Sequence, residues 1–149
     1  MNRDLLAVLT SQLHSQQGEA VAARSAADQM SDSSWARTLQ ADLALEANDF
    51  NAAISLTDNV TNTDDLSTLS LAIRGAALRQ TVHLATAQEV LREALRFPSR
   101  SAPVRHRARL ERARLFLAQG QPTKARQDLE RILAEDSQYV GVAELLTTL

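Results

Sequence analysis

The 149-residue sequence contains no cysteine and has few prolines, glycines and aromatic residues. The absence of cysteine excludes disulfides, thiolate nucleophiles and cysteine-ligated metal or iron–sulfur sites. Because there are only three prolines and four glycines, long stretches of the chain contain no helix breaker. Aromatic residues make up 3% of the chain, and helix-favouring alanine, leucine and arginine are abundant. This composition predicts an all-α protein.

Long hydrophobic runs are also missing. No apolar run approaches the roughly 20 residues that a membrane-spanning helix needs. Residues 5–9 form a short apolar patch, which lacks the flanking pattern of a secretory signal. Hydrophobic residues make up 44% of the chain and charged residues 23%, which is typical of globular proteins. We therefore expect one domain, residues 1–149, that is cytoplasmic and has no membrane contact.

The net charge of −2 conceals two halves of opposite sign. Residues 1–70 carry a net charge of −7, and residues 71–149 carry +5. Such an imbalance can orient a charged partner or favour head-to-tail contacts between copies. The alternative is ordinary variation among solvated helix faces.

A weak pattern occurs four times along the chain. In each copy a small residue is followed after seven residues by a turn-like residue, and five residues later by alanine. The small residues are Ser11, Ala41, Gly75 and Ala113; the turn-like residues are Gly18, Asn48, Val82 and Gly120; the alanines are Ala23, Ala53, Ala87 and Ala125. Successive copies begin 30, 34 and 38 residues apart. A unit repeated at this period is typical of a helical solenoid.

Apolar residues recur at helical spacing on both sides of each turn, so each copy predicts an antiparallel helical hairpin. The expected hairpins span about residues 4–31, 34–61, 65–97 and 103–136, followed by a capping helix over about 138–148. We expect the second helix of the 34–61 hairpin to run from 50 to about 60 and the final helix to begin at 138. Asp64 and Asp65 are expected to cap a helix rather than to act as acids.

The copies resemble the tetratricopeptide repeat (TPR). The last copy matches best, and its matching residues are Ala113, Phe116, Gly120, Ala125, Leu129 and Asp136. The copy that contains Trp35, Ala41, Asn48 and Ala53 is a second match. The resemblance implies a right-handed α-solenoid whose first helices line a concave groove for an extended peptide.

The resemblance also indicates which residues face such a groove. These candidates are Trp35, Thr38 and Asp42, then Ala72, Ala76 and Arg79, then Arg107, Leu110 and Arg114. Trp35 has an alternative interpretation as a core residue. The Lys and Asn set with which some family members hold a C-terminal carboxylate is replaced here by Val8, Gln12, Leu39 and Asp42. Binding of a chaperone tail is therefore not expected.

No set of residues points to catalysis or to a cofactor. His14, His83 and His106 lie in different hairpins, and none has a second potential metal ligand three or four residues away. There is no glycine-rich phosphate loop and no grouping of serine, histidine and aspartate. We expect neither enzymatic activity nor a bound metal or cofactor.

The densest charge cluster lies within residues 105–114. On a helix, Arg105, Arg109 and Arg112 share one face, and Arg107 and Arg114 share another. These faces could bind an acidic protein segment or nucleic-acid phosphates, or they could simply pair with Glu111 and neighbouring acids. Nucleic acid is the less favoured partner because few aromatic residues are available for stacking. We therefore expect a protein-binding module, with a nucleic-acid accessory role or a self-associating scaffold as alternatives.

Overall fold

The computed structural model describes residues 34–149, and this part of the chain is all-helical, with seven helices and no strand. The predicted 4–31 hairpin and the repeat positions Ser11, Gly18 and Ala23 lie outside the described residues. The helices are α3 (Ser34–Glu46), α4 (Phe50–Leu56), α5 (Asp65–Gln80), α6 (Leu84–Ala94), α7 (Ala102–Ala118), α8 (Pro122–Glu135) and α9 (Val142–Thr147).

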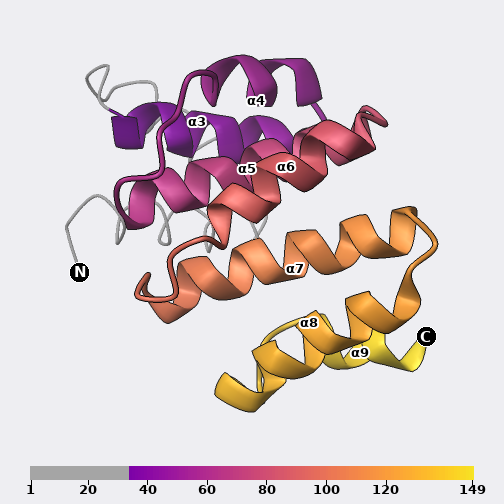
Figure 1. Ribbon diagram of the computed structural model, residues 1–149. Coiled ribbons are helices and arrows are strands. Elements are labelled where there is room, and N and C mark those ends of the chain that lie inside the picture. The colour runs from indigo at the N-terminus through magenta and orange to yellow at the C-terminus, as the bar shows by residue number, and fades with distance from the viewer. Residues whose placement is uncertain (1–33) are drawn as a thin grey trace.

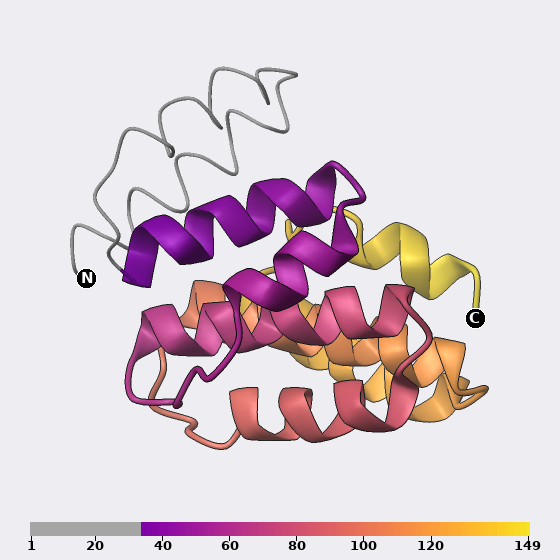
Figure 2. The ribbon, with the colours of Figure 1, turned by 90° about the horizontal axis from the view of Figure 1, so that it is seen from above.

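Consecutive helices pair as α3–α4, α5–α6 and α7–α8, and the pairs follow one another from top to bottom in Figure 1. The first helices are neighbours, since α5 packs against both α3 and α7. The second helices α4 and α6 also contact the first helix of the next pair, namely α5 and α7. In the last pair, α8 contacts α9 instead (Figure 2). This order leaves one side of α5 and α7 available to line a cleft.

The three hairpin turns share one backbone geometry. Asn48, Val82 and Gly120, the turn positions of the sequence repeat, all have left-handed φ angles, of 61°, 63° and 73°. The next residue in each turn donates its backbone N–H to the carbonyl five residues earlier, at 2.8 Å in all three turns. The left-handed residue itself donates to the carbonyl three residues earlier. Together these bonds form the Schellman motif that closes a helix.

Small residues of the repeat are buried where neighbouring helices pack together. Ala41, Ala53, Ala87, Ala113 and Ala125 are all fully buried. Gly75 on α5 is buried against Leu91 on α6, and a Cβ atom at Gly75 would lie 2.5 Å from Leu91 Cγ. Close approach of these helices therefore requires glycine at position 75.

Helix ends agree with the sequence in most places. α5 has the expected bounds, and Asp64 forms a capping box with Ser67, as predicted for a capping residue. The expected helix from 50 to about 60 is wrong, because α4 ends at Leu56. There the N–H groups of Thr57 and Asp58 bond to carbonyls three residues earlier, and Asn59 takes a left-handed φ of 59°. Arg74 Nη1 also donates to the Ile54 carbonyl at 2.7 Å.

The predicted start of the final helix at 138 is also wrong. Residues 137–141 form a turn, and α9 begins at Val142 after Gly141, whose φ is 87°. Asp136 holds the turn, since its side chain accepts the N–H of Gln138 and its carbonyl accepts the N–H of Tyr139. Tyr139 therefore lies on the turn rather than on the helix, and this places it beside α7.

A polar cluster joins the loops between hairpins. Asn62, which is buried, donates to the Glu93 carbonyl at 2.7 Å and accepts from Thr68 at 2.8 Å. Arg100 donates to Thr68 Oγ1 at 3.0 Å and to Asn62 Oδ1 at 3.2 Å. These bonds connect the loop before α5 with the loop before α7, so they fix the relative positions of the two helices that line the cleft.

Candidate functional site

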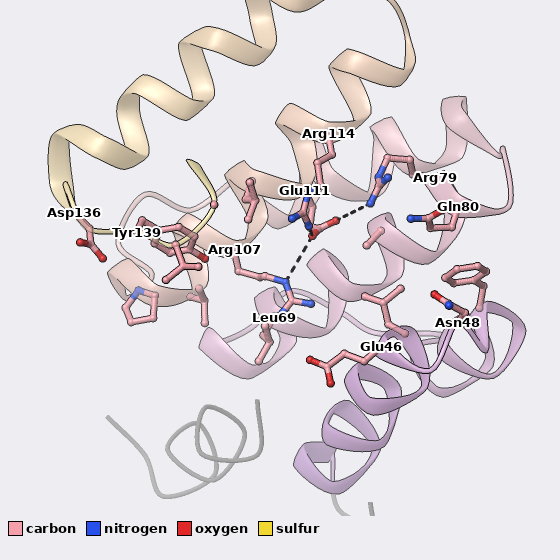
Figure 3. A pocket seen from close by; sticks show the side chains of 18 of the residues that line it. Glu46, Asn48, Leu69, Arg79, Gln80, Arg107, Glu111, Arg114, Asp136 and Tyr139 are labelled. Atoms are coloured by element: carbon pink, nitrogen blue, oxygen red, sulfur yellow. Dashed lines mark hydrogen bonds and ion pairs between the residues drawn. The ribbon is translucent and has the colours of Figure 1, made fainter. Parts of the chain in front are cut away.

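A cleft of about 680 Å³ runs along α5 and α7. The C-terminal end of α3 and the turn at 136–141 form its other walls. Figure 3 shows three arginines reaching into it, Arg79 from α5 and Arg107 and Arg114 from α7. Apolar side chains from the same helices, including Leu110, complete the lining.

The three arginines converge on one buried glutamate. Glu111 is only 2% exposed. Its Oε1 accepts from Arg114 Nη1 at 2.7 Å and lies 3.8 Å from Arg107 Nε. Its Oε2 accepts from Arg79 Nη2 at 3.3 Å. Both carboxylate oxygens are thus engaged, and the guanidinium groups are held in fixed positions around them.

Arg107 has a second carboxylate partner on a distant helix. Its Nη2 donates to Asp42 Oδ1 on α3 at 2.8 Å, and Asp42 is itself buried. Burial opposes the charge of Arg107, but Asp42 and Glu111 outweigh burial and raise the pKa of the guanidinium above its usual value. This pair connects the acidic N-terminal half of the sequence to the basic C-terminal half within one molecule.

The opposite face of α7 packs its arginines against α8. Arg105 and Arg109 both pair with Glu135, at 2.9 Å and 3.6 Å. Arg112 forms a two-bond pair with Asp128, at 2.6 Å and 2.8 Å. The predicted division of the arginines into two faces is therefore confirmed, and both faces are paired with acids of this chain.

One wall of the cleft is formed by the turn that carries Tyr139. Its ring meets the buried His106 ring edge to face, with ring centroids 5.5 Å apart. His106 Nε2 lies 3.0 Å from Glu135 Oε2, and because a carboxylate only accepts, Nε2 carries the proton. Burial raises the pKa of the Tyr139 phenol above its ordinary value. The sequence had suggested a helical position for Tyr139 and gave no sign of this contact.

The structure brings some of the predicted groove residues together and separates others. Ala76, Arg79, Arg107, Leu110 and Arg114 all line the cleft. The remaining candidates do not line the cleft: these are Trp35, Thr38, Asp42 and Ala72. Of these four, Asp42 is connected to the cleft through its ion pair with Arg107.

Each of the separated residues has a structural explanation. Trp35 packs against the apolar cluster of Leu39, Leu43 and neighbours. Thr38 is buried, donates to the Ser34 carbonyl at 2.7 Å and borders a separate hollow of about 340 Å³. Ala72 is buried against α6 and α7 residues. Residues that sequence reasoning did not place in the cleft, above all Glu111 and Tyr139, form its centre and one wall.

Chemically, the cleft offers oriented cations beside an apolar surface. Within residues 34–149 no group of three or more histidine and acidic side chains could hold a metal ion. The Nε of Arg79 is buried and has no hydrogen-bond partner among the described residues. Guanidinium groups placed in this way can bind a carboxylate. In the same part of the chain, no helix has the length and apolar character needed to cross a membrane.

Comparison with known proteins adds no family. No model of a known protein family matches the chain, and no curated protein matches it either. The TPR resemblance therefore stays a prediction.

Proposed function

We propose that this protein is a TPR-like α-solenoid that binds a segment of a partner protein in the cleft along α5 and α7, without catalysis. The observation that carries this proposal is the convergence of Arg79, Arg107 and Arg114 beside Leu110 in one open cleft. Oriented cations next to apolar surface suit a peptide with an acidic side chain, because complementary charge gives specificity and fast association.

The repeated geometry supports the solenoid part of the proposal. Three positions taken from the sequence repeat share one turn geometry, and the repeat alanines Ala53, Ala87 and Ala125 are buried at helix contacts. In addition, each second helix that precedes another hairpin packs on the first helix of that hairpin. An array built in this way can extend by adding units, which is the property that defines solenoids.

A nucleic-acid role has less support. The arginines of α7 are paired with Asp42, Glu111, Asp128 and Glu135, so they do not form an open row of cations. Phosphate backbones are usually bound by rows of unpaired lysine and arginine. Arg112 and Lys124 both lie over the Phe116 ring, where they would compete with a stacking base.

Selection of peptides from a random displayed library would test the proposal. We expect the protein to enrich peptides whose binding is lost in Arg114→Glu, because that side chain is 45% exposed at the cleft. Arg131→Glu is the matched control, since Arg131 is exposed on α8 and does not line the cleft. Arg107→Glu is unsuitable because it would place a third carboxylate beside buried Asp42 and Glu111.

Two results would contradict the proposal. One is failure to enrich any peptide in repeated selections with the folded protein. The other is enrichment of peptides that bind Arg114→Glu and Arg131→Glu as well as they bind the unchanged protein. Circular dichroism of each variant would establish that the helices are intact.

A further inference from the structure

Glu111 is a carboxylate of the chain itself that lies among the three cleft arginines. It is almost fully buried, and the side chains of Arg79, Arg107 and Arg114 all point toward it (Figure 3). One guanidinium can donate two parallel N–H bonds to a carboxylate of its own. Here the single carboxylate of Glu111 is shared by three guanidinium groups. Much of the hydrogen-bonding capacity of these arginines is therefore left over.

The leftover capacity is not evenly distributed. Arg107 is held by both Asp42 and Glu111. Within residues 34–149, Arg79 and Arg114 each pair with Glu111 and with no other carboxylate, and Arg79 Nε has no hydrogen-bond partner there. At the cleft centre, three guanidinium groups face two carboxylates, Asp42 and Glu111, which leaves one positive charge there. Glu46 and Asp136 also line the cleft, away from this centre.

The surroundings limit how much negative charge can enter. Glu111 lies at the centre of the arginines, and Asp136 lines the cleft on the Tyr139 side. A ligand with several negative charges would place at least one of them close to these carboxylates, where repulsion in a partly buried site is strong. Leu110 and Tyr139 add apolar surface that suits the stem of one acidic side chain.

We propose that Glu111 limits the charge that the cleft accepts: one carboxylate of a peptide segment binds between Arg79 and Arg114, and polyanions are rejected. This inference rests on the proposed peptide-binding role of the same cleft, and it adds the number of charges that the ligand carries. Glu111 is a specificity-determining residue in this scheme because its own charge satisfies the arginines in part.

The first experiment follows the arginine Nε–H signals by NMR during titration with N-acetylglutamate amide, which carries one carboxylate. We expect the signals of Arg79 and Arg114 to shift in a saturable way, with Arg92 on the outer surface as an internal reference. N-acetylglutamine amide should bind at least tenfold more weakly, because it has the same shape without the charge. Equal shifts with both compounds, or no shift with either, would overturn the inference.

The second experiment changes the charge at the cleft centre, Glu111. Glu111→Gln keeps the size and the hydrogen-bonding oxygen but removes one negative charge, so the cleft should bind tripolyphosphate at least tenfold more tightly than the unchanged protein. Glu89→Gln, on the exposed surface of α6, is the matched control and should change nothing. Equal tripolyphosphate binding by Glu111→Gln and the unchanged protein would overturn the inference.

A third variant covers the case in which Glu111→Gln does not fold. Arg114→Gln removes a half-exposed cation, and it should lower the affinity for N-acetylglutamate amide at least tenfold. Selected peptides separate this inference from the proposed function. If they depend on Arg114 but bind equally well when every acidic residue is amidated, the peptide-binding role stands and the single-carboxylate rule is wrong. If no peptide depends on the cleft, the proposed function is wrong.

Discussion

The hairpin turns and the cleft differ in how residue identity relates to structure. At the turns, the unlike residues Asn48, Val82 and Gly120 take the same backbone conformation. Among the arginines, like residues have unlike environments: Arg107 in the cleft is held by two buried carboxylates, whereas Arg92 on the outer surface of α6 is 66% exposed and pairs with the exposed Glu89. Residue type therefore predicts neither the turn nor the strength of an ion pair.

The difference has a physical reason. The turn geometry is set by two backbone hydrogen bonds that any residue except proline can form, so a side chain is tolerated as long as its strain is small compared with the packing of the two helices. The contribution of an ion pair depends on burial and on other partners, which come from helices far apart in the sequence. Local rules therefore govern the turns, and tertiary contacts govern the cleft.

Loss of Arg107 should have the largest effect and sharpen this contrast. Arg107→Ala leaves Asp42 and Glu111 buried with fewer partners, so we expect the free energy of unfolding to fall by about 3–5 kcal/mol. Arg92→Ala is the matched control and should cost less than about 0.5 kcal/mol, because its partner is an exposed residue three positions away. Urea denaturation followed by circular dichroism measures both changes. Similar losses in the two variants would remove the distinction between the cleft and the outer surface.

A change of turn residue should have a smaller effect of the opposite sign. Val82 is 75% exposed and β-branched, yet it has a positive φ, which is strained for such a residue. Val82→Gly should therefore raise the free energy of unfolding by about 1 kcal/mol after the entropy cost of glycine is counted.

The reciprocal change provides the control. Gly120→Val puts the same strain into the α7–α8 turn, where a Cβ atom would have no neighbour within 4 Å, so the protein should lose stability without any steric clash. Chemical denaturation of the pair would show opposite signs. If both changes destabilise the protein, the three turns are not energetically equivalent.

The smallest effect on stability is expected at Glu135 on α8, a partly exposed residue that pairs with Arg105 and His106 on α7. Two hydrogen bonds, the larger contribution coming from Arg105 and the smaller from His106, lower the pKa of the Glu135 carboxyl from 4.5 to about 2. A carboxyl with a lowered pKa contributes stability above its unfolded pKa, and this contribution is lost as the pH falls from about 4.5 to about 2. Glu135→Gln should therefore unfold with a weaker pH dependence in this window, measured by thermal melts at a series of pH values. An unchanged pH profile would show that the pair contributes nothing.

Much of the helical pattern could be predicted from the sequence, because it depends on local signals. The bounds of α5 and its cap at Asp64 follow from apolar periodicity and capping chemistry. The early end of α4 depends instead on bonds that include one from Arg74, which comes from the next hairpin. The position of Tyr139 depends on a left-handed Gly141 and on packing against His106. Periodicity alone contains neither kind of information.

The cleft could be predicted only in part for the same reason. Spacing on α7 placed Arg107 and Arg114 on one face, and the structure brings that face to Arg79. The pairing of Asp42 with Arg107 joins residues 65 positions apart, and no local pattern identifies it. Thr38 was expected at the groove because of its place in the repeat, but its hydroxyl bonds to its own helix.

The distribution of the two largest chromophores gives this protein separate optical reporters. Trp35 is the single tryptophan and packs in the apolar cluster shared by α3 and α5, whereas the single tyrosine, Tyr139, forms part of the cleft wall some hundred residues later. Indole fluorescence therefore follows the first described hairpin, and the phenol signal follows the turn at the cleft wall near the other end of the chain. Following both signals during unfolding would distinguish two cases: loss at different denaturant concentrations means that the helical pairs separate one at a time, and simultaneous loss means that they separate together.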